Sequence, residues 1–112
     1  MKYTKHVSEP WFTFIKDGIK TVEGRLNKGS FAEMKKGDII VWITSNSKIQ
    51  VKTKIVAIHK YKTFYEYLQK ERLKNTLPNV NRIKKGESIY YQYYSKEDEK
   101  KYGVLAIRLK LI

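Results

Sequence analysis

Hydrophobic and polar positions alternate in two stretches of the chain, and both stretches predict β-strands. In residues 20–26 (KTVEGRL), Val22 and Leu26 occupy one face, while Glu23 and Arg25 occupy the other. A second alternation runs through residues 48–61, where every second position from 49 to 55 suits a buried face. Because this second stretch is longer than a typical strand, we expect it to bend or to contain a bulge.

Three further strands are expected from short apolar runs. Residues 2–7 (KYTKHV) can form a first strand, and residues 39–45 (IIVWITS) form a continuous apolar strand that a turn at 46–47 connects to the next one. Residues 104–112 (VLAIRLKLI) close the chain as a strand, with Arg108 and Lys110 on its outer face.

Helical spacing appears in three places. Residues 8–18 (SEPWFTFIKDG) predict a short helix with Ser8 as the N-cap and an apolar stripe formed by Trp11, Phe14 and Ile15. Residues 62–75 predict a second helix, capped by Thr63, whose apolar face also carries Glu71. Residues 87–103 hold one or two helical turns, with a capping-box-like Ser95 and Asp98, and the intervening residues 76–86 are expected to be irregular.

These elements predict a single α+β domain over residues 1–112, because the chain contains no linker, repeat or low-complexity block. About five strands with three short helices inserted between them are typical of a small mixed β-barrel with helices at its rim. The 112 residues are sufficient for one modest hydrophobic core.

The charge of the chain favours anionic partners. It carries 24 basic and 11 acidic residues, a net charge of +13, which attracts phosphate backbones. Because most of the basic residues are lysine, and Ile, Asn and Tyr are also frequent, A/T-rich codon usage is a competing explanation of the same skew.

Cysteine is absent and the two histidines lie on separate segments, so we expect no metal site and no cofactor. No apolar stretch of the roughly 20 residues needed to span a membrane is present, and the polar N-terminal stretch lacks a signal-peptide core. We therefore expect an intracellular protein, cytoplasmic or nuclear, that is neither membrane-bound nor secreted.

One combination of motifs resembles a known family. The segment PWFTFIKDGIKTVEGRL, with the spacing GxKTxExR, is followed about ten residues later by MKKGDIIVW. The chain then continues through KYKTFYEYL, LPNV and YYQYYS to the terminal YGVLAIRLKLI. Over residues 3–112 this order resembles the ASCH family, a branch of the PUA-like β-barrel superfamily.

The resemblance implies a cleft beside the first helix that binds RNA, nucleotides or modified nucleosides. A bacterial branch of the family hydrolyses the acetyl amide of N4-acetylcytidine, with a lysine, a threonine and a downstream glutamate as its proposed catalytic set. The lysine corresponds to Lys20 and the glutamate loosely to Glu71, but the threonine position holds Glu23. An amidohydrolase would therefore use Lys20, Glu23 and Glu71, with water as the nucleophile.

The residue types suit recognition of a base. On one strand face, Glu23 can accept from amino groups while Arg25 donates in a planar fork, and Lys20 can contact phosphate or serve as a base. An aromatic ring such as Trp11 can stack on a base. We accordingly expect the ligand site to contain Ser8, Trp11, Lys20, Glu23, Arg25 and Tyr91, with His6 beside Ser8 at the rim.

The tyrosines at 90–94 divide into two groups. Tyr90, Tyr93 and Tyr94 share one face at helical spacing, and Tyr91 points elsewhere. We expect the cluster to pack in the core with its hydroxyls at the edge. Base stacking, for which Tyr91 is the candidate, is the alternative.

Each of these expectations has an alternative. The pair of Glu23 and Arg25 can serve as an ion pair that braces the mouth of the barrel. Trp11 can be a core residue, and Glu71 can bond Arg25, Arg72 or a backbone amide. At the level of function, the lead hypothesis is an RNA- or nucleotide-binding module. The alternatives are an amidohydrolase acting on an acylated nucleoside, and a protein-interaction adaptor that binds acidic protein partners.

Overall fold

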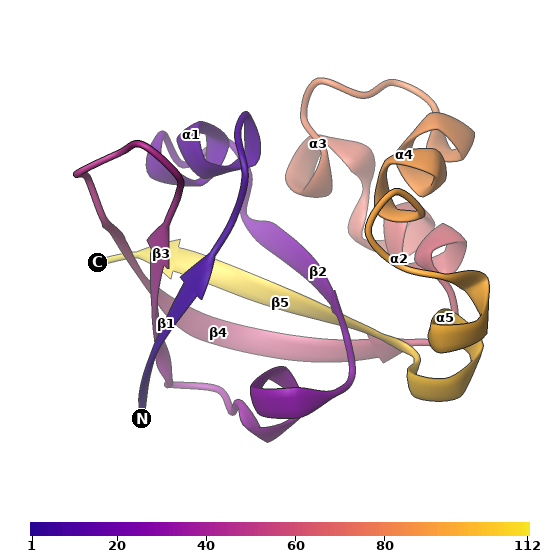
Figure 1. The fold of residues 1–112 in the computed structure, drawn as a ribbon, viewed down its shortest axis with the longest axis horizontal. Coiled ribbons are helices and arrows are strands. Elements are labelled where there is room, and N and C mark those ends of the chain that lie inside the picture. The colour runs from indigo at the N-terminus through magenta and orange to yellow at the C-terminus, as the bar shows by residue number, and fades with distance from the viewer.

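The computed structural model describes residues 1–112 as five strands, five short α-helices and one 3-10 helix (Figure 1). The strands are β1 (Lys2–His6), β2 (Val22–Leu26), β3 (Ile39–Ile43), β4 (Val51–Tyr61) and β5 (Val104–Leu111). The helices are α1 (Trp11–Lys16), η1 (Gly29–Glu33), α2 (Phe64–Glu71), α3 (Leu73–Thr76), α4 (Ile83–Tyr90) and α5 (Lys96–Tyr102). None of these helices is long and apolar enough to cross a membrane.

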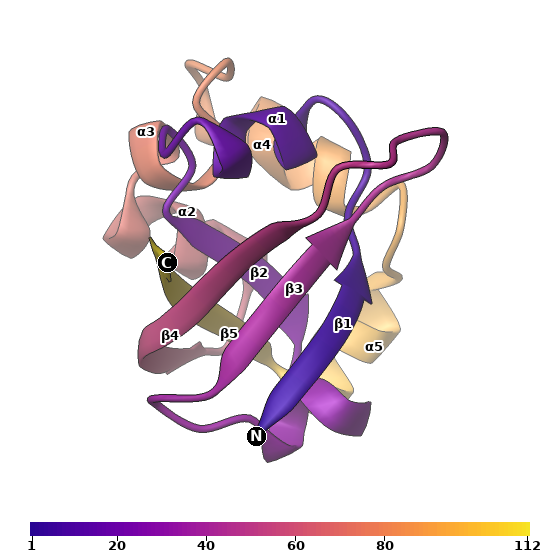
Figure 2. The same cartoon turned by 90° about the vertical axis from the view of Figure 1, so that its left-hand side faces the viewer.

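The five strands form one mixed sheet in the order β1-β3-β4-β5-β2, in which β1 and β3 are parallel and the other pairs are antiparallel. The sheet curls into a half-barrel, so that its two edge strands, β1 and β2, approach each other without pairing (Figure 2). The expectation of a small mixed barrel of about five strands with helices at its rim is therefore confirmed.

The long strand β4 bends, as its length predicted. Its pairing with β5 shifts register between Ile55 and Ala57, which marks a bulge. Such a bulge increases the local twist of a strand. The two ends of β4 therefore pair with different strands. Residues 51–54 of β4 pair with β3, and residues 53–61 pair with β5.

The buried side chains form two clusters on either side of β5. One cluster lies between the sheet and α1 and includes Phe12, Ile15 and the fully buried Trp42. The other lies where α2 and α4 cover β2 and β5, and it includes Phe64 and Tyr67. A half-buried residue, Trp11 at the start of α1, packs against both clusters and therefore lies at the boundary between them.

Two details of the helices differ from the predictions. Ser8 does not cap α1: the N-cap is Pro10, and the Glu9 carboxylate accepts hydrogen bonds from the backbone N–H and the hydroxyl of Thr13. The helix also buries Phe12 and Ile15 rather than the stripe at 11, 14 and 15.

The helix expected over residues 62–75 is divided at Arg72, whose φ is 74°, into α2 and α3. In the segment expected to be irregular, Thr76 ends α3 and Ile83 begins α4. The apolar residues of α3 and α4 pack on α2, and this tertiary contact overrides weak local propensity. The cap predicted at Ser95 is confirmed, because its hydroxyl accepts from the Asp98 N–H at 3.0 Å.

Candidate functional site

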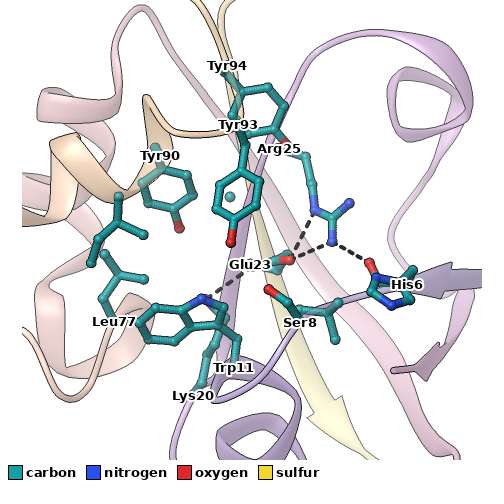
Figure 3. A pocket seen from close by; sticks show the side chains of 13 residues that line it. His6, Ser8, Trp11, Lys20, Glu23, Arg25, Leu77, Tyr90, Tyr93 and Tyr94 are labelled. Atoms are coloured by element: carbon teal, nitrogen blue, oxygen red, sulfur yellow. Dashed lines mark hydrogen bonds and ion pairs between the residues drawn. The ribbon is translucent and has the colours of Figure 1, made fainter. Parts of the chain in front are cut away.

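A pocket of about 260 Å³ opens where the half-barrel is split, between β1, β2, α1 and the end of α4 (Figure 3). One wall is aromatic and apolar, and the opposite wall carries the charged residues of the GxKTxExR motif. The thirteen lining residues are His6, Val7, Ser8, Trp11, Lys20, Glu23, Gly24, Arg25, Leu77, Ile89, Tyr90, Tyr93 and Tyr94. The volume lies just below the range of about 300–1,000 Å³ typical of drug-sized ligand sites, so the pocket suits one small ring system.

The charged wall is built around Glu23, whose side chain lies on the face of β2 opposite to Val22 and Leu26 because β2 is a regular strand. Its Oε2 accepts from Arg25 Nε at 3.0 Å and from Arg25 Nη2 at 2.9 Å. The same Nη2 donates to the His6 backbone carbonyl at 2.9 Å. Arg25 thus connects the edge strands β1 and β2, which do not pair with each other. Its guanidinium also lies over the rings of Phe31 and Trp42.

The ammonium group of Lys20 lies behind this pair and is buried, with 2% of the residue exposed. Its Nζ has three acceptors: Val22 O at 2.7 Å, Thr76 O at 2.5 Å and Glu23 Oε1 at 3.2 Å. An ammonium has three N–H donors, so this environment matches the protonated side chain and leaves it no lone pair to offer. Lys20 is therefore placed as a structural cation.

Burial and charge act in opposite directions on these groups. Burial acts to raise the pKa of Glu23, but the charges of Lys20 and Arg25 outweigh it and hold that pKa below its ordinary value. Burial lowers the pKa of Lys20, and the Glu23 carboxylate opposes that effect. Two cations around one carboxylate leave the charged wall with one net positive charge.

The aromatic wall is held in place from behind by α2. The rings of Tyr90 and Tyr94 both stack on Phe64, with centroid distances of 4.5 and 5.6 Å. The Tyr90 hydroxyl is also hydrogen-bonded to the buried Tyr67 hydroxyl at 3.0 Å. Burial is the main cause that raises the pKa of Tyr90, so this hydroxyl stays neutral at physiological pH.

The rim of the pocket offers groups that have no partner within the protein. The hydroxyls of Ser8 and Tyr93 and the indole N–H of Trp11 form no hydrogen bond with another residue, although all three residues line the pocket. Tyr93 is 63% exposed, so its ring stands at the opening. The charged residues are thus paired with one another, while the polar groups at the rim have no protein partner.

The structure brings together five of the six residues proposed for the site, namely Ser8, Trp11, Lys20, Glu23 and Arg25. Tyr91 lies outside the pocket, because it faces α5, where its hydroxyl donates to Glu99 Oε1 at 2.8 Å. Tyr90 belongs to a core cluster and Tyr94 packs against it, as expected, whereas Tyr93 is exposed, and all three also line the pocket. Their shared helical face was the signal that could have identified them.

Glu71 is also separate from the pocket. Its carboxylate is buried and accepts from Arg108 at 2.8 and 3.0 Å, and it contacts the Tyr61 hydroxyl. Burial acts to raise the pKa of Glu71, but the hydrogen bonds from Arg108 and Tyr61 hold it below its ordinary value. Glu71 is therefore bonded to an arginine, but the partner is Arg108 on β5 rather than the expected Arg25 or Arg72.

Comparison with known proteins identifies the family. The ASCH domain model matches residues 6–112, so the chain belongs to the ASCH family. No match was found among curated proteins.

Solved structures share the fold over the whole chain. The hypothetical protein PH0355 is 41% identical, with a TM-score of 0.90 and all of both chains covered. The protein PF0455 from Pyrococcus furiosus is 37% identical, with a TM-score of 0.82, and the match covers 100% of this chain and 98% of that one. A mutant form of ZmASCH from Zymomonas mobilis is 16% identical with a TM-score of 0.66, covering 96% of this chain and 66% of that one, and this supports the fold alone.

Proposed function

We propose that the protein is an RNA- or nucleotide-binding module that holds one base in the pocket beside α1. The observation that carries this proposal is the pairing of two unlike walls across a pocket of about 260 Å³. The flat rings of Trp11, Tyr93 and Tyr94 suit the face of a base, and the Glu23–Arg25 pair suits its polar edge.

The rest of the molecule is suited to holding the phosphates that flank such a base. The chain carries a net charge of +13, and the charged wall of the pocket is itself positive. A pocket for one base, rather than a groove for a duplex, favours single-stranded RNA or a free nucleotide or modified nucleoside. Recognition would then rest on stacking, hydrogen bonds to the base and counterion release, without bond breaking.

The arrangement of charged groups favours binding over amide hydrolysis. Lys20 commits its three donors to protein acceptors, so it could act as a base only after losing a proton and one of those contacts. Position 23 is a glutamate held ionised by two cations, and Glu71 lies outside the pocket with Arg108 as its partner. Lys20 and Glu23 are in contact, but an amidohydrolase that also used Glu71 would need a carboxylate that lies outside the pocket.

The proposal is tested by titrating short single-stranded RNA against the protein and following fluorescence anisotropy at low and near-physiological salt. Tyr93→Ala removes an exposed ring from the pocket, and Tyr65→Ala removes a ring of comparable exposure (46%) on α2, outside the pocket. Stacking contributes about 1–3 kcal/mol per base, which corresponds to a roughly 5- to 150-fold loss of affinity. We expect that loss for Tyr93→Ala, and wild-type affinity for Tyr65→Ala.

A second pair of variants separates site binding from nonspecific charge. Arg25→Ala and Arg82→Ala each remove one positive charge, but Arg82 is exposed and lies outside the pocket. If binding disappears at moderate salt, and both variants weaken it equally, the affinity is a nonspecific polyelectrolyte effect. That result would contradict the proposal. Turnover of N4-acetylcytidine that depends on Lys20 would favour the amidohydrolase instead.

A further inference from the structure

The strand β2 pairs along one edge only, and the hydrogen bonds to its partner β5 alternate along that edge. Leu109 N–H donates to Thr21 O at 2.8 Å, and Asn27 N–H donates to Gly103 O at 3.0 Å. In an antiparallel ladder with this register, residues 21, 23, 25 and 27 bond to β5. The residues between them turn their backbone N–H and C=O groups toward the opposite edge, where the half-barrel is split.

Gly24 offers both of these backbone groups freely. On either side of it, Val22 O accepts from Lys20 Nζ at 2.7 Å, and Leu26 O accepts from the Lys28 N–H at 2.8 Å. The N–H and C=O of Gly24 form no hydrogen bond within the protein, and Gly24 lines the pocket. Because glycine has no side chain, its backbone is what forms that part of the wall.

A side chain could not be accommodated at position 24. A Cβ there would lie 2.5 Å from Cζ of Tyr67, whose ring is completely buried. The packing of Tyr67 against the strand therefore keeps this position free of a side chain and leaves one bare peptide unit at the pocket wall. Polar backbone groups in such a position need a partner, either water or a ligand.

We propose that the backbone of Gly24 reads the edge of the bound base, with its N–H donating to a ligand acceptor and its C=O accepting from an adjacent ligand N–H. This inference rests on the proposed function and names the ligand class as a planar heterocycle with a lactam or amidine edge. Within a strand the two groups of one residue point the same way, so they match a donor and an acceptor side by side on one ring.

An extended peptide is a poorer fit to the same edge. Adding a strand requires a run of free residues, because its affinity comes from repeated main-chain hydrogen bonds. Here the carbonyls of Val22 and Leu26 on either side are already occupied, so Gly24 is the one residue on this edge that offers both its N–H and its C=O. One such residue suits a single planar group, and the aromatic rings beside it suit the face of that group.

The inference is tested on the full chain by NMR-detected hydrogen exchange. Each of the four ribonucleosides is added at saturating concentration, together with its analogue methylated on the edge nitrogen: 3-methyluridine, N4,N4-dimethylcytidine, 1-methylguanosine and N6,N6-dimethyladenosine. For a nucleoside that binds, we expect exchange of the Gly24 amide to slow at least tenfold and its methylated analogue to bind at least tenfold more weakly. The Gly29 amide, outside the pocket, is the control and should not change.

The outcomes distinguish this inference from the proposed function. If a nucleoside binds while Gly24 exchanges as in the free protein, and its methylated analogue binds equally well, the Gly24 contact is refuted and the base-binding function stands. If no nucleoside or short single-stranded RNA binds at all, the proposed function fails and the inference fails with it.

Discussion

Replacing Lys20 by methionine tests whether this residue is a structural cation or a latent base. Methionine keeps an unbranched side chain of similar length but removes the ammonium from its three acceptors. Glu23 then loses the partner of its Oε1 oxygen, and the carbonyls of Val22 and Thr76 lose their donor. All of these groups lie in or beside a site where Lys20 and Glu23 are only 2% and 5% exposed.

The expected loss of folding stability follows from that burial. Removing one partner of a buried ion pair costs about 3–5 kcal/mol, and an unsatisfied buried carbonyl costs about 1–3 kcal/mol. Relief from burying the ammonium offsets part of this total. We therefore expect Lys20→Met to lower the free energy of unfolding by about 3–5 kcal/mol, a large fraction of the 5–15 kcal/mol typical of a domain.

Urea unfolding at pH 7, followed by circular dichroism, measures this change. Lys54→Met is the matched control, because Lys54 is exposed on β4 and its side chain forms no ion pair. Such a surface substitution should stay within about 0.5 kcal/mol of wild type. In the double variant Lys20→Met/Glu23→Gln the carboxylate charge is also absent. Its loss of unfolding free energy should therefore be smaller than the sum of the losses in the two single variants. Wild-type stability in Lys20→Met would refute the structural role and reopen the possibility of a neutral, basic amine.

Three further predictions concern stability. Gly24→Ala should destabilise the fold by about 1–3 kcal/mol in urea unfolding, because the added methyl group overlaps the buried Tyr67 ring; wild-type stability would show that the ring can move aside. Glu71→Gln should lower stability by about 1–3 kcal/mol yet leave RNA affinity unchanged, since Glu71 lies outside the pocket; a matching loss of affinity would contradict that separation. Because the folded-state pKa of Glu23 lies below its unfolded value, its contribution to stability is present above about pH 4.3 and is lost as the pH falls through the folded pKa. The stability difference between wild type and Glu23→Gln, measured by urea unfolding from pH 7 to pH 3, should therefore shrink on acidification, and a constant difference would refute the ionised pair.

Local pattern was sufficient to predict most of the fold. The alternation in β2 correctly assigned Val22 and Leu26 to the core, and the length of β4 correctly predicted its bulge. The break between α2 and α3 and the early start of α4 were not predicted, because these helices are short and pack on α2, so tertiary contacts rather than propensity decide where they begin. The cap of α1 was misplaced because the helix begins only after Pro10, and the Thr13 N–H bonds the Glu9 carboxylate instead of the Ser8 hydroxyl.

The charged wall of the pocket could be predicted because its residues follow one another on a single strand and the turn before it. The aromatic wall could not, because its tyrosines come from a segment more than sixty residues later, and only the packing of Phe64 shows which side they face. The backbone edge at Gly24 has no sequence signal of its own. It depends on the register of β2 against β5 and on a strand order that leaves β2 at the split of the barrel.

The most direct test of base binding uses the two tryptophans of the chain. Trp11 lies at the pocket, whereas Trp42 is fully buried with its indole N–H bonded to Thr53. We would titrate single-stranded RNA and the four ribonucleosides into wild type and Trp11→Phe at near-physiological salt and record tryptophan emission. The account predicts saturable quenching in wild type and unchanged Trp42 emission in the variant. Emission that does not respond to any of these ligands, or that responds equally in both proteins, would contradict it.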